Sequence, residues 1–126
     1  MAKKKGQQTE VAGYISKASL QHTRVSPRKA RLVVDMIRGK QIEQALDILS
    51  NCDKKTAPLL KKLLLSAVAN AGQSSGVNVD ELYIKSAWVD AGRTIHRVMP
   101  RARGSASPIR KRHSSITVLL DEVGVR

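Results

Sequence analysis

Residues 93–113, with the sequence RTIHRVMPRARGSASPIRKRH, carry a density of positive charge that no apolar core can accommodate. The stretch contains no Asp or Glu, and its basic residues are Arg93, Arg97, Arg101, Arg103, Arg110, Lys111 and Arg112. Its large apolar residues are only Ile95, Val98, Met99 and Ile109. Burial of so few side chains cannot offset the entropy lost when the segment becomes ordered. We therefore expect its conformation to depend on the partner that it contacts.

The segments on either side have the composition of β-strands. Residues 81–90 (ELYIKSAWVD) and 114–121 (SSITVLLD) are rich in β-branched and large apolar residues. If the turn lies near Gly104, residues 80–122 form an extended β-hairpin whose arms of roughly 20 residues reach about 65 Å. A compact body made of the other residues has a radius of gyration of only about 12 Å, so the hairpin protrudes. The alternative is a disordered basic loop at residues 93–113.

The distribution of charge points to a polyanionic partner. The net charge is +13, yet residues 32–92 contain seven basic and seven acidic residues and are neutral. Residues 1–31 contain eight basic residues and one acidic residue, and residues 93–113 contain seven basic residues. The like charges within each of these two segments repel one another. A polyanion, most often a nucleic acid, relieves that repulsion. A membrane is disfavoured because neither basic segment has a wide apolar face.

Helical periodicity dominates the middle of the chain. Ser26 is expected to cap a helix through its side chain, with Pro27 in the first helical position and Gly39 at the end. A second helix follows the apolar spacing of residues 42–49, and a third begins between residues 54 and 57 and ends near Ala71. The apolar stripes are Ala30, Val33, Val34, Ile37; Ile42, Ala45, Leu46, Leu49; and Leu60, Leu63, Leu64, Ala67, Val68, Ala71, the last widened by Leu59 and Leu65.

A short strand is expected at residues 11–20, where apolar and polar residues alternate loosely. These elements predict an α+β fold in which three helices pack on a small antiparallel sheet, with a long protruding β-hairpin. The chain of 126 residues contains no linker or internal repeat, so a single domain over residues 1–126 is expected, with a flexible basic tail at residues 1–10.

A second group of cations crowds the start of the first helix, where the helix dipole disfavours positive charge. Its members are Arg24, Arg28, Lys29 and Arg31. Two interpretations remain open, namely that these side chains are simply solvated or that they contact phosphates.

No constellation for catalysis or metal binding occurs in the sequence. His22, His96 and His113 are scattered among cations, and Cys52 is the only cysteine, which makes a reducing cytosolic setting the default. An apolar segment typical of a signal peptide or a membrane span is also missing. We expect no enzyme activity, no cofactor and no small-molecule substrate. Because the basic stretches contain no aromatic residue, a folded nucleic acid is favoured over a single strand.

Five motifs resemble one known family. They are SPRKARLVVDMIRGK (residues 26–40), ALDIL (45–49), SAVANA (66–71), VMPRARG (98–104) and SSITV (114–118). In this order and spacing they are similar to the universal large-subunit ribosomal protein numbered twenty-two, in its bacterial form. The resemblance covers residues 11–122 and is carried most specifically by the first and fourth motifs.

The resemblance implies a structural protein of the large ribosomal subunit in the cytoplasm, which binds large-subunit rRNA and supports early assembly. We assign the rRNA contacts to the seven basic residues of the hairpin and to the four at the first helix. The tip that lines the nascent-peptide exit tunnel, beside the fourth large-subunit protein, comprises Met99, Pro100, Arg101, Ala102, Arg103 and Gly104. Ile95, His96 and Arg97 match a segment associated with macrolide resistance.

This chain departs from the family at two positions of the hairpin. Ser105 follows the tip glycine where a basic residue is common, and His96 stands where Lys is common. The rival interpretation from the residues alone is an architectural DNA-binding protein with basic β-arms, in which Pro100 or Pro108 wedges into a minor groove. A third possibility, an RNA-processing enzyme, conflicts with the absence of catalytic groups.

Overall fold

The computed structural model describes residues 13–123 and contains one sheet and three helices. The tail expected at residues 1–10 lies outside the described residues. The antiparallel sheet has the order β1-β3-β2, with β1 at Ser16–Thr23, β2 at Leu82–Pro100 and β3 at Ala106–Glu122. The helices are α1 at Pro27–Ile37, α2 at Ile42–Ser50 and α3 at Thr56–Gly72.

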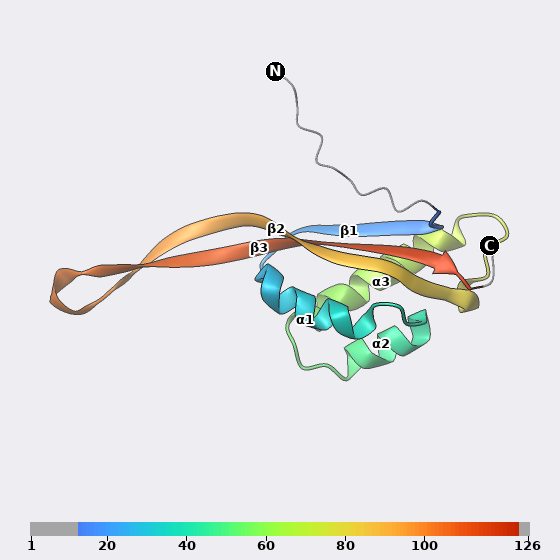
Figure 1. Ribbon diagram of the computed structural model, residues 1–126, viewed down its shortest axis with the longest axis horizontal. Coiled ribbons are helices and arrows are strands. Elements are labelled where there is room, and N and C mark those ends of the chain that lie inside the picture. Colours follow the sequence, from blue (N-terminus) through green and yellow to red (C-terminus); the bar gives the residue numbers. More distant parts are fainter. Residues whose placement is uncertain (1–12, 124–126) are drawn as a thin grey trace, which may run out of the picture.

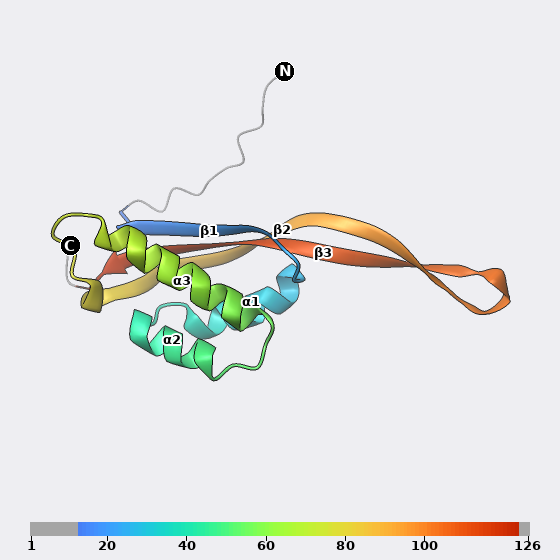
Figure 2. The same ribbon diagram turned by 180° about the vertical axis from the view of Figure 1, so that it is seen from behind.

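All three helices lie on the same face of the sheet, while β2 and β3 continue together far beyond them (Figure 1). The view from behind shows the same arrangement, with the other face of the sheet free of helices (Figure 2). The predicted α+β fold, with helices packed on a small antiparallel sheet and a long hairpin, is therefore confirmed. No helix within residues 13–123 is long and apolar enough to cross a bilayer.

The helices follow the predicted apolar spacing, but the expected side-chain cap is wrong. Ser26 occupies the N-cap of α1 without a side-chain hydrogen bond, and only its carbonyl accepts a bond, from the Ala30 amide at 3.0 Å. Pro27 stands at the first position of the helix, and Gly39 follows its end with φ +77°. Pro27 thus sets the start of α1 without help from the serine hydroxyl.

The core lies between the helices and one face of the sheet. Each helix buries its predicted stripe, apart from Leu46, Leu59 and Val68, which are half-buried, and Leu65, which is exposed. The buried residues of α3 are spaced three or four apart and turn one side of the helix toward the sheet. Leu65 lies outside that side and is therefore exposed to solvent. The strands contribute Leu82, Ile84, Ile116, Val118 and Leu120 to this core, and in β3 the intervening Thr117 and Leu119 are buried as well.

Strand β1 differs from its prediction in both bounds. It begins at Ser16 and ends at Thr23, whereas residues 11–20 were predicted, and residues 11–12 lie outside the described part of the chain. Pairing explains the bounds, because Ser16 faces Leu120 and Thr23 faces Ser114, at the two ends of the body segment of β3. The Ser16 hydroxyl also donates to the Ala67 carbonyl at 2.6 Å, which ties β1 to α3.

Candidate nucleic-acid interface

The basic stretch at residues 93–113, which we call the arm, is a continuous two-stranded ribbon. Beyond the body, pairing runs from Thr94 opposite Arg112 to Pro100 opposite Ala106. The strands predicted at residues 81–90 and 114–121 are thus joined by further pairs, and the alternative of a disordered loop is wrong. Figures 1 and 2 show the ribbon twisting as it leaves the body.

Every predicted cation of the arm is exposed. The acidic residues of the described chain lie elsewhere, and the ion pairs found within residues 13–123 join Arg38 to Asp35 and Lys85 to Asp121. The arm cations are therefore not neutralised within the described part of the chain. These side chains require negative charge from a partner. Phosphate groups supply it, whereas the interior of a protein does not.

The turn at the tip is closed by its own backbone. The Arg101 amide donates to the Ser105 carbonyl at 2.8 Å, and the Ser105 hydroxyl donates to the Ala102 carbonyl at 2.8 Å. Arg103 and Gly104 both have positive φ, +59° and +71°. Gly104 adopts this conformation without steric cost, whereas Arg103 does so at some expense. Ser105 thus serves the turn itself through its hydroxyl and its carbonyl.

A β-bulge marks the root, where the arm leaves the body. Ala91 pairs with Ser114 and Thr94 pairs with Arg112, so Gly92 and Arg93 together face the single residue His113. A Cβ placed on Gly92 would lie 3.2 Å from both the carbonyl carbon and the carbonyl oxygen of His113. Glycine therefore permits this close approach of the two backbones, and bulges of this kind increase the local twist.

The root also contains buried polar atoms without partners in the described chain. Thr23 Oγ1, Ser114 Oγ and His113 Nδ1 have no hydrogen-bond partner within residues 13–123. Thr23 and Ser114 are cross-strand neighbours, and both residues are buried. Unpartnered buried hydroxyls weaken the fold at this point.

The structure brings the second group of predicted cations to this root. Arg24 directly follows Thr23, the last residue of β1, and α1 begins beside the place where β2 and β3 leave the body (Figure 1). Arg24, Arg28 and Lys29 are exposed, while the Arg31 Nη2 donates to the Val89 carbonyl at 3.1 Å. The two groups, separate in the sequence, thus adjoin in space, although Arg31 is partly engaged by β2.

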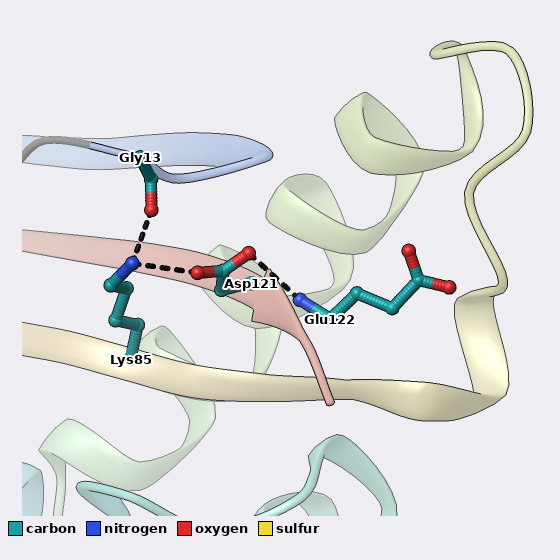
Figure 3. A network of polar contacts seen from close by, with 4 residues as sticks. All are labelled: Gly13, Lys85, Asp121 and Glu122. Carbon is teal, nitrogen blue, oxygen red and sulfur yellow. Dashed lines mark hydrogen bonds and ion pairs between the residues drawn. The ribbon is translucent and has the colours of Figure 1, made fainter. Parts of the chain in front are cut away.

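Two cations that sequence reasoning did not single out serve the fold. Arg38 donates through Nε and Nη2 to the Ala87 carbonyl at 3.2 and 2.9 Å, which fixes α1 against β2. Lys85 lies at a bulge in β2, and its ammonium contacts the Gly13 carbonyl and the Asp121 carboxylate, the latter at 2.7 Å (Figure 3). These two cations differ from those of the arm only in their tertiary contacts. The sequence pattern therefore could not identify them as structural.

The Lys85 hydrogen bond holds the pKa of Asp121 below its ordinary value of 3.8, and the Glu122 amide acts in the same direction. Lys85 is near the start of β2 and Asp121 near the end of β3, so this ion pair lies at the end of the sheet opposite the arm. Among residues 13–123 no group of three or more His, Cys, Asp or Glu residues is placed to hold a metal ion. The exposed cations of the described chain gather instead at the arm and its root.

Comparison with known proteins gives consistent matches. Residues 18–121 match the family described as Ribosomal protein L22p/L17e. Large ribosomal subunit protein uL22 of Bdellovibrio bacteriovorus is 49% identical over 106 residues, which cover 84% of this chain and 96% of that protein. Proteins of the same name from Syntrophotalea carbinolica and Thermus thermophilus are 51% and 50% identical over 107 residues, covering 85% of this chain and 97% and 95% of theirs.

Proposed function

Because the chain belongs to the ribosomal protein L22p/L17e family, we propose that it is a structural constituent of the large ribosomal subunit and binds large-subunit rRNA through its arm and root. Membership agrees with the resemblance carried by the sequence motifs. Relatives in this family are structural ribosomal proteins, so the chain is not an enzyme. Its proposed location is the cytoplasm, on the large subunit.

The observation that carries the proposal is the set of exposed cations distributed from the root to the tip of the arm. The arm contributes Arg93, Arg97, Arg101, Arg103, Arg110, Lys111 and Arg112, and the root adds Arg24, Arg28, Lys29 and part of Arg31. Arginine predominates in this set, and its planar guanidinium can bind a phosphate through two parallel hydrogen bonds or stack on a base.

The same surface suggests how the chain supports early assembly. A two-stranded ribbon is marginally stable on its own, so contact with folded rRNA stabilises the arm while the arm neutralises phosphates that repel one another. The packed body positions the root, and the ribbon carries the cations into the RNA. One such protein can thereby join RNA segments that lie far apart in the rRNA sequence.

Finer proposals concern the end of the arm. We place Met99–Gly104 at the wall of the nascent-peptide exit tunnel, beside the fourth large-subunit protein, with the nascent peptide as a transient partner. Ile95, His96 and Arg97 correspond to the segment where changes affect macrolide sensitivity. The length of the arm supports both assignments, because β2 continues from the body past the bulge at Gly92 as far as Pro100.

Sedimentation of a gently opened cell lysate at moderately high salt, with the chain followed by immunoblotting, tests the proposal. We expect the chain to migrate with large subunits and translating ribosomes. Recovery only in light fractions, or with chromosomal DNA, would contradict it. The affinity of the purified chain for folded rRNA and for bent duplex DNA then separates rRNA binding from the DNA-architectural alternative.

A further inference from the structure

The two edges of the sheet differ in how the body covers them. Strand β3 is central, so β1 and β2 each have a strand neighbour on one side only (Figure 1). In the body, α1 covers the outer edge of β2, where Arg38 donates to the Ala87 carbonyl. Arg31 of the same helix donates to the Val89 carbonyl, and two backbone bonds join Ile84 to the segment that follows α1. The body edge of β2 is therefore covered by its own chain.

The outer edge of β1 has no comparable cover. The Asn70 side chain donates to the Lys17 carbonyl at 3.4 Å, and this is the one bond found at that edge within residues 13–123. The contact shows that Lys17 turns its backbone away from β3, and by the alternation of an antiparallel pair Ser19 does the same. Lys17, Ser19 and Gln21 are all exposed. The Lys17 amide and both backbone groups of Ser19 thus face outward without a partner in the described chain.

This row of backbone groups fits an extended polypeptide. Ser19 presents a donor and an acceptor together, and Lys17 presents a further donor two residues earlier. A polypeptide strand supplies acceptors and donors at this spacing when it adds to the edge of a sheet. Phosphates accept hydrogen bonds but donate none, so the backbone of a nucleic acid would leave the Ser19 carbonyl without a donor.

The surroundings of the edge restrict the composition of that polypeptide. The Asn70 contact brings the exposed side of α3 beside β1, and the same side carries Lys62, Leu65 and Ser66. Strand β1 contains no acidic residue, so Lys17 and Lys62 repel a basic segment and favour one that carries a carboxylate. Residues 1–12 contain three Lys and one Glu, which disfavours the chain's own N-terminal segment as the occupant.

We infer that the open edge of β1 receives an extended segment of a neighbouring protein, which joins the sheet as a fourth strand. Its backbone pairs with Lys17 and Ser19, an apolar side chain lies on Leu65, and a carboxylate faces one of the two lysines. The inference goes beyond the proposed function, which assigns no partner to β1. It depends on that function only for the particle in which the partner is sought.

Photocrosslinking in purified large subunits tests whether a polypeptide lies at this edge. Lys17→p-benzoylphenylalanine places a photoreactive side chain there, and Glu43→p-benzoylphenylalanine places the same group at an exposed position of α2. Mass spectrometry then identifies what is attached. We expect position 17 to yield an adduct with one stretch of one protein, and position 43 not to yield that adduct. Adducts with rRNA alone, or none, at position 17 would overturn the inference.

A matched pair of variants separates strand addition from mere proximity. Ser19→Pro removes the outward N–H and no bond to β3, whereas Ser19→Ala removes only the hydroxyl. In the background that carries the photoreactive group at position 17, we expect the proline to lower the yield of the polypeptide adduct several-fold and the alanine to leave it unchanged. Equal yields in the two variants would overturn pairing through the backbone.

Hydrogen exchange of the wild-type chain decides the question should Ser19→Pro not enter subunits. The Ser19 amide should exchange several-fold more slowly in subunits that contain the crosslinked protein than in subunits reconstituted without it. Equal rates in the two particles would overturn the inference. Failure of the proposed function is recognised separately, because the wild-type chain would then be missing from large subunits.

Discussion

The body and the arm use the same two strands in opposite ways. In the body, alternate residues of β3, namely Ile116, Val118 and Leu120, are fully buried against the helices. In the arm, no residue between 93 and 113 is buried, although the pairing of β2 with β3 continues. Strand pairing alone therefore sets the geometry, and the side chains decide whether a segment is stabilised by its own core or by a partner.

This difference predicts that the body contributes most of the free energy of unfolding and that the arm contributes little. Leu60→Ala removes a side chain with zero exposure from α3, and we expect it to lower the free energy of unfolding by about 2–5 kcal/mol. Val98→Ala truncates a side chain of the arm that is 70% exposed, and it should change the free energy of unfolding by less than about 0.5 kcal/mol. Urea denaturation followed by circular dichroism measures both. Similar losses at the two positions would mean that the arm is part of the cooperative core.

For RNA binding we expect the reverse, with substitutions in the arm having a larger effect than substitutions in the body. In Arg110→Gln/Arg112→Gln, the loss of two phosphate contacts should reduce the magnitude of the salt slope of rRNA affinity by about 1.4–1.8, with little change in stability. Lys54→Gln, which removes an exposed cation of the body between α2 and α3, should leave the slope unchanged. Filter-binding titrations over a range of salt concentrations give the slopes. Equal slopes for the double variant and the wild type would contradict the assignment of these arm contacts.

The root lies between the two regions. Because it contains buried hydroxyls without partners in the described chain, a substitution there should raise the free energy of unfolding. Thr23→Val replaces a buried hydroxyl that has no partner within residues 13–123 by a methyl group of similar size. We expect the free energy of unfolding to rise by about 1 kcal/mol. Urea denaturation measures the change, with Thr94→Val on the half-exposed arm as the control. A clear loss of stability in Thr23→Val would show that the hydroxyl has a partner after all.

The sequence predicted the body well wherever spacing decided the outcome. The helical stripes identified all three helices, because an amphipathic helix must turn its apolar residues toward a core. Leu65 and Ser26 were misjudged for a tertiary reason, since the packing of α3 leaves Leu65 exposed and α1 begins without a side-chain bond from Ser26. The bounds of β1 were missed because its loosely alternating residues become a strand only where β3 pairs with them.

The arm was predicted from composition, but its internal organisation was not. Charge density indicated a basic surface, and the flanking apolar segments indicated a hairpin. Which residues of the arm share a side of the ribbon depends on the register, which the bulge at Gly92 shifts by one residue on β2, and no sequence pattern fixes that register. The junction of the two cation groups at the root likewise required the pairing of Thr23 with Ser114.

The smallest predicted effect concerns the end of the sheet farthest from the arm. The Lys85 ammonium lowers the pKa of Asp121, whose carboxylate lies 2.7 Å away. A carboxyl group with a lowered folded-state pKa adds stability that is complete above its unfolded value and is lost as the pH falls through the folded value. The contribution of this pair should therefore be present above the ordinary value of 3.8 and fade below it.

The variant Asp121→Asn tests this dependence by urea denaturation between about pH 6 and about pH 2. We expect it to be less stable than the wild type by up to about 1 kcal/mol near pH 6, as is usual for a partly exposed ion pair, and the difference to vanish at the acid end. Lys85→Gln/Asp121→Asn should add little to either single change if the two side chains act as one pair. A difference that persists at the lowest pH would assign the loss to packing around residue 121 instead of to its charge.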